Sequence, residues 1–135
     1  MATLLAHITV RPGGERQFED VARSLYERTH AVEHGVRRYE YWRGTTPRSY
    51  YTLLSFDDHR AFIAHQTSDH HEAASPALGQ LIEHLRLEWL DPVPGASALA
   101  VTAHLPAAEG ASGLVVAYTD RFAATVADWW LAQRL

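Results

Sequence analysis

The sequence predicts an α+β domain whose elements follow the order strand, helix, strand, strand, helix, strand. Stretches in which every second residue is apolar, typical of strands, alternate with stretches of helical apolar spacing over the first 90 or so residues. Gly, Pro and Asp separate these stretches. A short turn at 44–48 also joins two strand-like segments, which predicts an antiparallel hairpin.

The first predicted strand covers residues 3–11. Its apolar side chains on one face are Leu4, Ala6, Ile8 and Val10. Pro12, Gly13 and Gly14 end it, and residues 15–34 have helical apolar spacing. His30 and His34 fall in the last turns of this helix, and Gly35 is the expected C-cap.

Residues 36–43 and 50–56 are the two strands of the hairpin. Asp57 or Asp58 then caps a helix that runs through His65. A further helix begins near Ser68 and Asp69, and Ser75 with Pro76 predicts a fresh cap and first turn. The apolar stripe that follows consists of Leu78, Leu81, Ile82 and Leu85.

Residues 86–90 form the last predicted strand and complete the ferredoxin-like β-α-β-β-α-β pattern with a four-stranded antiparallel sheet. We therefore assign residues 1–95 to one domain. Residues 96–135 are a connector followed by a C-terminal helix from Leu114. Its apolar face is expected to pack on its own or a partner subunit and consists of Phe122, Val126, Trp129 and Trp130.

The composition excludes several classes of function. A net charge of −4 without a basic cluster argues against nucleic-acid binding. No window approaches the ~18 consecutive apolar residues of a membrane span, and the N-terminus lacks a basic leader, so we expect no membrane association. The absence of cysteine fits a cytoplasmic location and excludes a thiolate nucleophile, and the absence of lysine excludes a Schiff base.

Histidines gather in the segment 52–74, where a strand end, aromatic rings and imidazoles converge. His65, His70 and His71 are candidates for a general base, because imidazole titrates near neutral pH. Adjacent helical residues point about 100° apart, so at most one of His70 and His71 should face a cavity well. His30 and His34 have metal-ligand spacing without an evident third ligand, which favours a solvated pair over zinc; we predict no metal.

With this order of elements, the sequence resembles the antibiotic biosynthesis monooxygenase family of dimeric α+β barrels, including its quinol monooxygenases. The resemblance covers about residues 3–92 and is carried by HITVRPG at 7–13, HGVRRYEYWR at 34–43, LLSFDDHRAFIAHQTSDHHEAA at 53–74 and the strand at 86–91. It implies a homodimer in which two sheets pack face to face, with a pocket in each subunit between sheet and helices. His7, on the face that such a dimer would cover, is expected to serve the contact.

Many members of that family oxidise quinols or anthrones with molecular oxygen and without metal or flavin, and others degrade haem. The positions matching the asparagine, tryptophan and histidine of the haem-degrading relatives hold Ala6, His65 and Ser75, so haem is disfavoured. Those matching the asparagine, tryptophan and tyrosine of the anthrone-oxidising relatives hold Thr52, Phe56 and Phe62. A quinol monooxygenase pocket is the closer analogue.

The resemblance implies a cofactor-independent monooxygenase acting on a small, electron-rich aromatic. Its base or donors would be His65, His70 or His71, and its substrate contacts Thr52, Leu54, Phe56 and Phe62. Surface or capping roles for the histidines and core roles for the phenylalanines are the competing interpretations. At the level of function, the alternatives are a non-oxidative isomerase or cyclase on the same fold and a non-catalytic barrel that binds small molecules.

Overall fold

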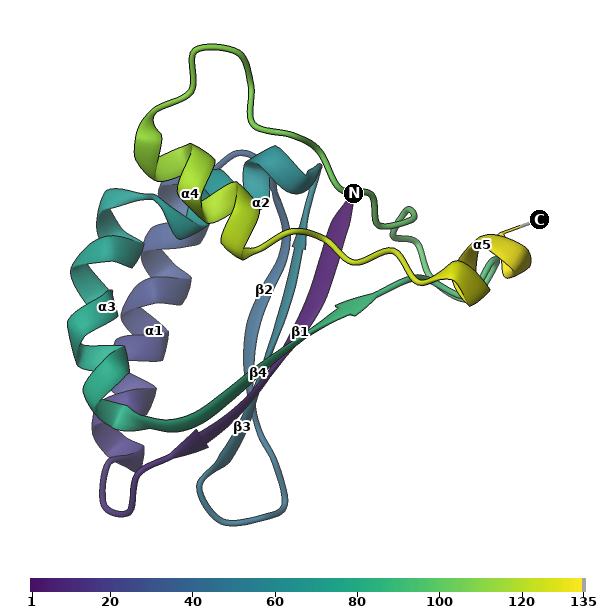
Figure 1. Ribbon diagram of the computed structural model, residues 1–135. Helices are drawn as coiled ribbons and strands as arrows, with labels where there is room; N and C mark the ends of the chain where they lie inside the picture. The colour runs from purple at the N-terminus through teal and green to yellow at the C-terminus, as the bar shows by residue number, and fades with distance from the viewer. Residues whose placement is uncertain (135) are drawn as a thin grey trace.

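The computed structural model describes residues 1–134 and confirms the predicted order of the first seven elements (Figure 1). These are β1 (Ala2–Val10), α1 (Glu15–Val32), β2 (Val36–Arg43), β3 (Ser49–Phe56), α2 (His59–Gln66), α3 (Asp69–Leu81) and β4 (Ile82–Leu90). The strands form one antiparallel sheet in the order β2-β3-β1-β4. The helices α1 to α3 lie on one face of this sheet (Figure 1).

The central strand β1 supplies the middle of the core. Its side chains at alternate positions are almost completely buried, as the periodicity predicted: Leu4, Ala6, Ile8 and Val10. Ala6 lies opposite Thr52 of β3 and Leu87 of β4, so these three side chains share the helix-covered face of the sheet. This face forms the floor of the cavity described below.

The first helix ends two residues earlier than predicted, at Val32, with Glu33 as an extended C-cap whose N–H donates to Thr29 O. Gly35 follows where the chain passes closest to α2; a Cβ there would lie 2.8 Å from the Ala61 Cβ. The early end of the helix matters for the site. Because the helix ends at Val32, Glu33 lies outside it and its side chain contacts His65 of α2.

Two boundaries around α3 were predicted wrongly. Ser68 caps α3, and the helix then continues through Pro76 to Leu81, whereas Ser75 and Pro76 had been expected to start it afresh. An interior proline removes one backbone hydrogen bond, but here the packing of α3 on α1 holds the helix together. Strand β4 begins at Ile82, four residues early, because its pairing with β1 extends down to Val10.

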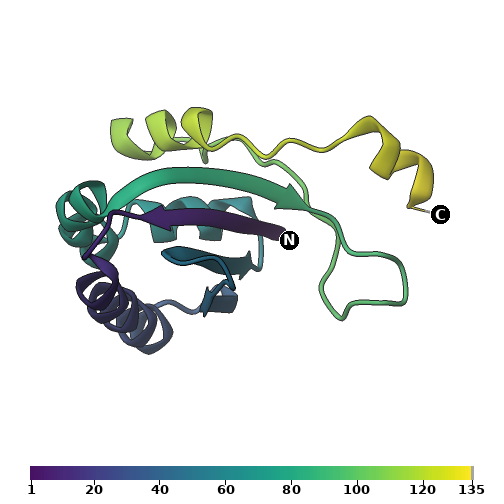
Figure 2. The same ribbon diagram turned by 90° about the horizontal axis from the view of Figure 1, so that it is seen from below.

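The C-terminal extension is helical, as expected, but in two pieces: α4 (Gly113–Arg121) and α5 (Asp128–Gln133). Residues 122–127 are not helical, so the predicted aromatic face does not exist as one surface. Helix α4 packs against α2 and lies beyond the β4 edge, whereas α5 projects away from the sheet (Figure 2). Trp129 on α5 is 70% exposed in the single chain, whereas Phe122 packs against the core, so packing of the rest of this face on its own or a partner subunit stays a prediction.

Polar side-chain contacts fasten this extension to the body. The two ring nitrogens of His59 each lie 2.9 Å from a carbonyl oxygen, those of Leu105 and Phe122. Arg134 forms an ion pair with Asp91. None of the helices described is both long and apolar enough to cross a membrane.

Candidate active site

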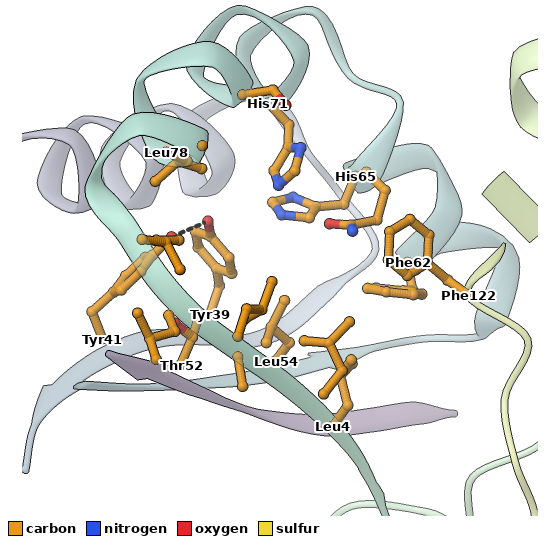
Figure 3. Close-up of a pocket in the computed structure, with 18 of the residues that line it drawn as sticks. Leu4, Tyr39, Tyr41, Thr52, Leu54, Phe62, His65, His71, Leu78 and Phe122 are labelled. Atoms are coloured by element: carbon orange, nitrogen blue, oxygen red, sulfur yellow. Dashed lines mark hydrogen bonds between the residues drawn. The ribbon is translucent and has the colours of Figure 1, made fainter. Parts of the chain in front are cut away.

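A cavity of about 400 Å³ lies between the helix-covered face of the sheet and the helices α2, α3 and α4 (Figure 3). Leu4 and Leu54 form its floor, and Phe62 and Phe122 stand side by side at one end. The two histidines in its lining lie close together, as do its two strand tyrosines. The lining is thus mostly apolar with a few grouped polar atoms, which is typical of small-molecule sites.

Five of the seven predicted site residues line this cavity: Thr52, Leu54, Phe62, His65 and His71. Phe56 does not; it is fully buried, with its ring 5.2 Å from that of His65, and belongs to the core. His70 does not either. Of the adjacent pair only His71 reaches the cavity, as the 100° between neighbouring helical residues requires.

His65 is held by a carboxylate that the sequence did not single out. The side chain of His65 is fully buried at the end of α2, and its Nδ1 lies 2.8 Å from Glu33 Oε2. Burial raises the pKa of Glu33, but hydrogen bonds and positive charge from His65 and His70 outweigh it and leave that pKa below its usual value. Glu33 is therefore ionised at neutral pH and accepts, so Nδ1 carries the proton.

The second ring nitrogen of His65 lies in a different environment from the first. Its Nε2 is buried and has no hydrogen-bond partner within residues 1–134. A neutral imidazole carries one proton, so a proton on Nδ1 leaves a lone pair on Nε2. A buried polar atom without a partner is costly, and a ligand in the cavity that donates a proton there would remove that cost. With the ring in its neutral form, the contact between Glu33 and His65 would leave Nε2 as the nitrogen able to accept a proton.

His71 contributes a second imidazole beside the first. The two ring centroids are 5.0 Å apart, and the Nδ1 of His71 is also buried without a partner in the described part of the chain. Burial, and then the neighbouring His65, lower the pKa of His71 to about 4. His71 is therefore neutral at physiological pH and can hydrogen-bond a ligand without adding charge.

The shift at His71 predicts a pH dependence of stability. Between the ordinary pKa of 6.5 and about 4 the unfolded chain binds the proton and the folded chain does not. The free energy of unfolding should therefore fall as the pH is lowered through this window, by up to about 1.4 kcal/mol per pH unit. Urea unfolding across the window should give a shallower slope for His71→Gln. The exposed-site variant His34→Gln should keep the wild-type slope, and equal slopes in both variants would contradict the assignment.

Hydroxyl groups gather in another part of the cavity. The hydroxyl oxygens of Tyr39 and Tyr41 are 2.9 Å apart (Figure 3). Burial raises the pKa of Tyr41 to about 12 and that of Tyr39 well above its ordinary value, so both stay protonated. Thr52 Oγ1 lies buried in the same lining with no partner among the residues described. This group can donate hydrogen bonds to an oxygen of a bound molecule.

The C-terminal extension closes the cavity on the β4 side. Tyr118 of α4 donates a hydrogen bond of 2.7 Å to Glu72 of α3 and lines the opening. Phe122 packs edge-on against Phe62, with ring centroids 6.0 Å apart. The extension is therefore part of the site as well as of the fold.

Three residues of the candidate site were not predicted from the sequence: Glu33, Tyr39 and Tyr41. A weak signal existed for the tyrosines, since residues two apart in a strand share one face. For Glu33 the only hint was a carboxylate in the last predicted turn of a helix, where a negative charge is unfavourable and a tertiary partner is to be expected.

Comparison with known proteins agrees with this architecture. A Caulobacter crescentus protein, a candidate antibiotic biosynthesis monooxygenase, is 28% identical, with 68% of this chain and 89% of that chain covered at a TM-score of 0.64. A Pseudomonas aeruginosa protein is 24% identical over 66% of this chain and 90% of its own, with a TM-score of 0.61. A Mycobacterium tuberculosis protein at 18% identity covers 71% and 98%, with a TM-score of 0.64.

At these identities the second and third proteins bear on the fold alone. No curated protein matches the chain. The sequence profile of the family described as Antibiotic biosynthesis monooxygenase matches residues 1–77 of the 135, which include β1 to β3, α2 and most of α3. The chain therefore belongs to the antibiotic biosynthesis monooxygenase family.

Proposed function

We propose that the protein is a monooxygenase that oxidises an electron-rich aromatic, a hydroquinone or an anthrone, with molecular oxygen and no metal or organic cofactor. One observation carries the proposal: His65 belongs to the lining of an aromatic cavity, its Nε2 is buried without a partner among residues 1–134, and its Nδ1 lies 2.8 Å from Glu33 Oε2. A histidine held in this way could act as the base toward a substrate bound in the cavity. Family membership adds the reaction class.

In the proposed reaction, the main contribution of the protein is to remove a proton from the aromatic substrate. Triplet oxygen reacts slowly with closed-shell molecules, but a delocalised anthrone or hydroquinone anion can give it one electron. His65 Nε2 would remove the proton that creates this anion. For an anthrone, the resulting radical and superoxide combine to a peroxide, which loses water to form the quinone carbonyl. One oxygen atom enters the product and the other leaves as water.

The hydroxyl group of the cavity supplies the complementary interaction. As the substrate loses its proton, charge develops on its oxygen, and buried donors oriented toward that oxygen stabilise the charge most effectively. Tyr39 and Tyr41 bond to each other, so the pair has one further O–H to donate, and the Thr52 hydroxyl lies close enough to Tyr41 to offset part of the rise that burial causes in its pKa. His71, neutral at working pH, can bond a second polar atom of the substrate.

Oxygen consumption by chelator-treated protein tests the proposal. With a small panel of anthrones and hydroquinones, the wild type should exceed the autoxidation rate, and His65→Gln should lower the excess at least about 100-fold because the base is lost. His34→Ala, at an exposed histidine outside the cavity, is the matched control and should keep the full rate.

Other outcomes point to the alternatives. Turnover that persists without oxygen would replace the oxidative reaction by an isomerisation or cyclisation that uses the same base. Binding of the aromatics without turnover would identify a non-catalytic barrel. An unchanged rate in His65→Gln would remove the proposed base.

We further propose that the protein is a homodimer through the open face of the sheet. That face carries apolar side chains that are only partly buried in one chain: Leu5, Tyr51, Leu53 and Leu90, with Trp42 58% exposed beside them. His7 lies on the same face and bonds to Glu88, so the polar groups there are already satisfied within the subunit. A second copy would bury this surface in the way expected for the family.

A further inference from the structure

Three potential metal ligands meet on the Nδ1 side of His65: His65 itself, which lines the cavity, and Glu33 and His70, which do not. Glu33 follows α1, His65 lies in the last turn of α2 and His70 in the first turn of α3. Each offers one ligand atom within 4.8 Å of the other two. Glu33 Oε2 lies 2.8 Å from His65 Nδ1 and 3.0 Å from His70 Nε2. The sequence predicted no metal, because only His30 and His34 had ligand spacing; the fold assembles a different set.

These distances are close to those of a bound cation. Zinc binds imidazole nitrogen and carboxylate oxygen at about 2.0–2.2 Å, which places tetrahedral ligand atoms about 3.3 Å apart. The two oxygen–nitrogen distances differ from this value by only a few tenths of an ångström, and the two nitrogens lie within 4.8 Å of each other. Two hydroxyls, of Thr29 and Ser68, lie 3.3 Å from His70 Nε2 and could hold a metal-bound water.

The cluster can be reached from solvent without passing through the cavity. A second, outer pocket of about 540 Å³ is lined by Glu33 and His70, together with Asp69 and Arg28 on its rim. The charges of Asp69 and Arg28 offset each other, which leaves the carboxylate of Glu33 as the net charge. This is a favourable route for a small cation.

We propose that Glu33, His65 and His70 bind a divalent first-row transition metal ion such as Zn²⁺. Two imidazoles and one carboxylate, with the outer pocket left for water, form a donor set that suits these ions better than Mg²⁺ or Ca²⁺, which prefer oxygen. The ion replaces the two N–H protons that now point at Glu33. Both imidazoles therefore bind it through nitrogens that change tautomer.

Binding has a consequence for His65, which rests on the function proposed above. A cation on Nδ1 forces the single proton of the neutral ring onto Nε2, the nitrogen that does not contact Glu33. His65 then donates where it previously accepted, and it can no longer take a proton from the substrate. The ion thus acts as an inhibitor that reaches His65 from the outer pocket and not from the cavity.

The test uses full-length protein without a histidine tag and Zn²⁺ alone, followed by calorimetry. Wild type should bind one ion per chain. His70→Ala and Glu33→Gln should each bind at least about tenfold more weakly, since each removes a ligand, and His34→Ala should bind like wild type. Circular dichroism verifies that each variant is folded. Zn²⁺ should also raise the melting temperature of wild type and not that of His70→Ala.

The outcomes separate the site from the function. Absence of saturable binding, or equal affinity in His70→Ala and wild type, would overturn the proposed site. If binding follows the pattern above and oxygen uptake falls as the site fills, the coupling to His65 is supported. Undiminished uptake by the zinc-loaded wild type would overturn that coupling. A protein without oxygenase activity would still support or refute the site through binding alone.

Discussion

If the protein has the function proposed above, replacing Glu33 by glutamine is expected to slow oxidation of the aromatic at least about 100-fold while leaving its binding intact. Glu33 is not part of the cavity lining described, so in the proposed reaction its role would be to position His65. As a carboxylate it can only accept, which fixes the proton on Nδ1 of His65. A glutamine can also donate through its amide, and the opposite tautomer, with a protonated Nε2, then becomes accessible.

Two measurements distinguish this effect from general damage to the fold. The turnover number should fall, whereas the dissociation constant of an unreactive aromatic analogue should stay within about twofold, because the cavity lining is unchanged. Nitrogen NMR of labelled histidine should show His65 protonated on Nδ1 in wild type and on a mixture of the two nitrogens in the variant. Full turnover with a mixed tautomer would mean that Glu33 does not orient the base.

Local patterns in the sequence were sufficient for the fold. The alternation from Leu4 to Val10, the hairpin turn and the aspartate at the start of α2 each depend on neighbouring residues, and each prediction was confirmed. The element boundaries that were predicted wrongly depend on residues that are distant in the sequence. Ile82 joins a strand because it pairs with Val10, and no local rule contains that pairing.

The site was only partly predictable for the same reason. His65, His71 and Phe62 lie within one short segment, so their convergence could be seen in the sequence. Glu33 reaches His65 across 32 positions, through a helix that ends two residues early and a glycine that lets the chain approach α2. Such a contact follows from packing and not from periodicity. The orienting carboxylate therefore became visible only in the folded chain.

Replacing Phe62 by alanine is expected to lower the free energy of unfolding by about 3–5 kcal/mol, a large part of the stability of a domain of this size. Phe62 is 1% exposed and joins the body to the C-terminal extension. Its ring centroid lies 5.7 Å from that of Phe56, 5.4 Å from that of Trp89 and 6.0 Å from that of Phe122. The substitution leaves a void among rings that cannot close it without moving the backbone.

The matched control is Trp129→Ala, which removes a larger ring from the 70%-exposed surface of α5 and should change stability by less than about 0.5 kcal/mol in the monomer. Urea unfolding of both variants at one protein concentration measures the difference. Because Phe62 supports Phe122, its loss should also expose the segment 96–127 to limited proteolysis before the rest of the chain unfolds. A Phe62 variant as stable as the Trp129 variant, with an equally protected extension, would show that the aromatic contacts do not hold the extension over the cavity.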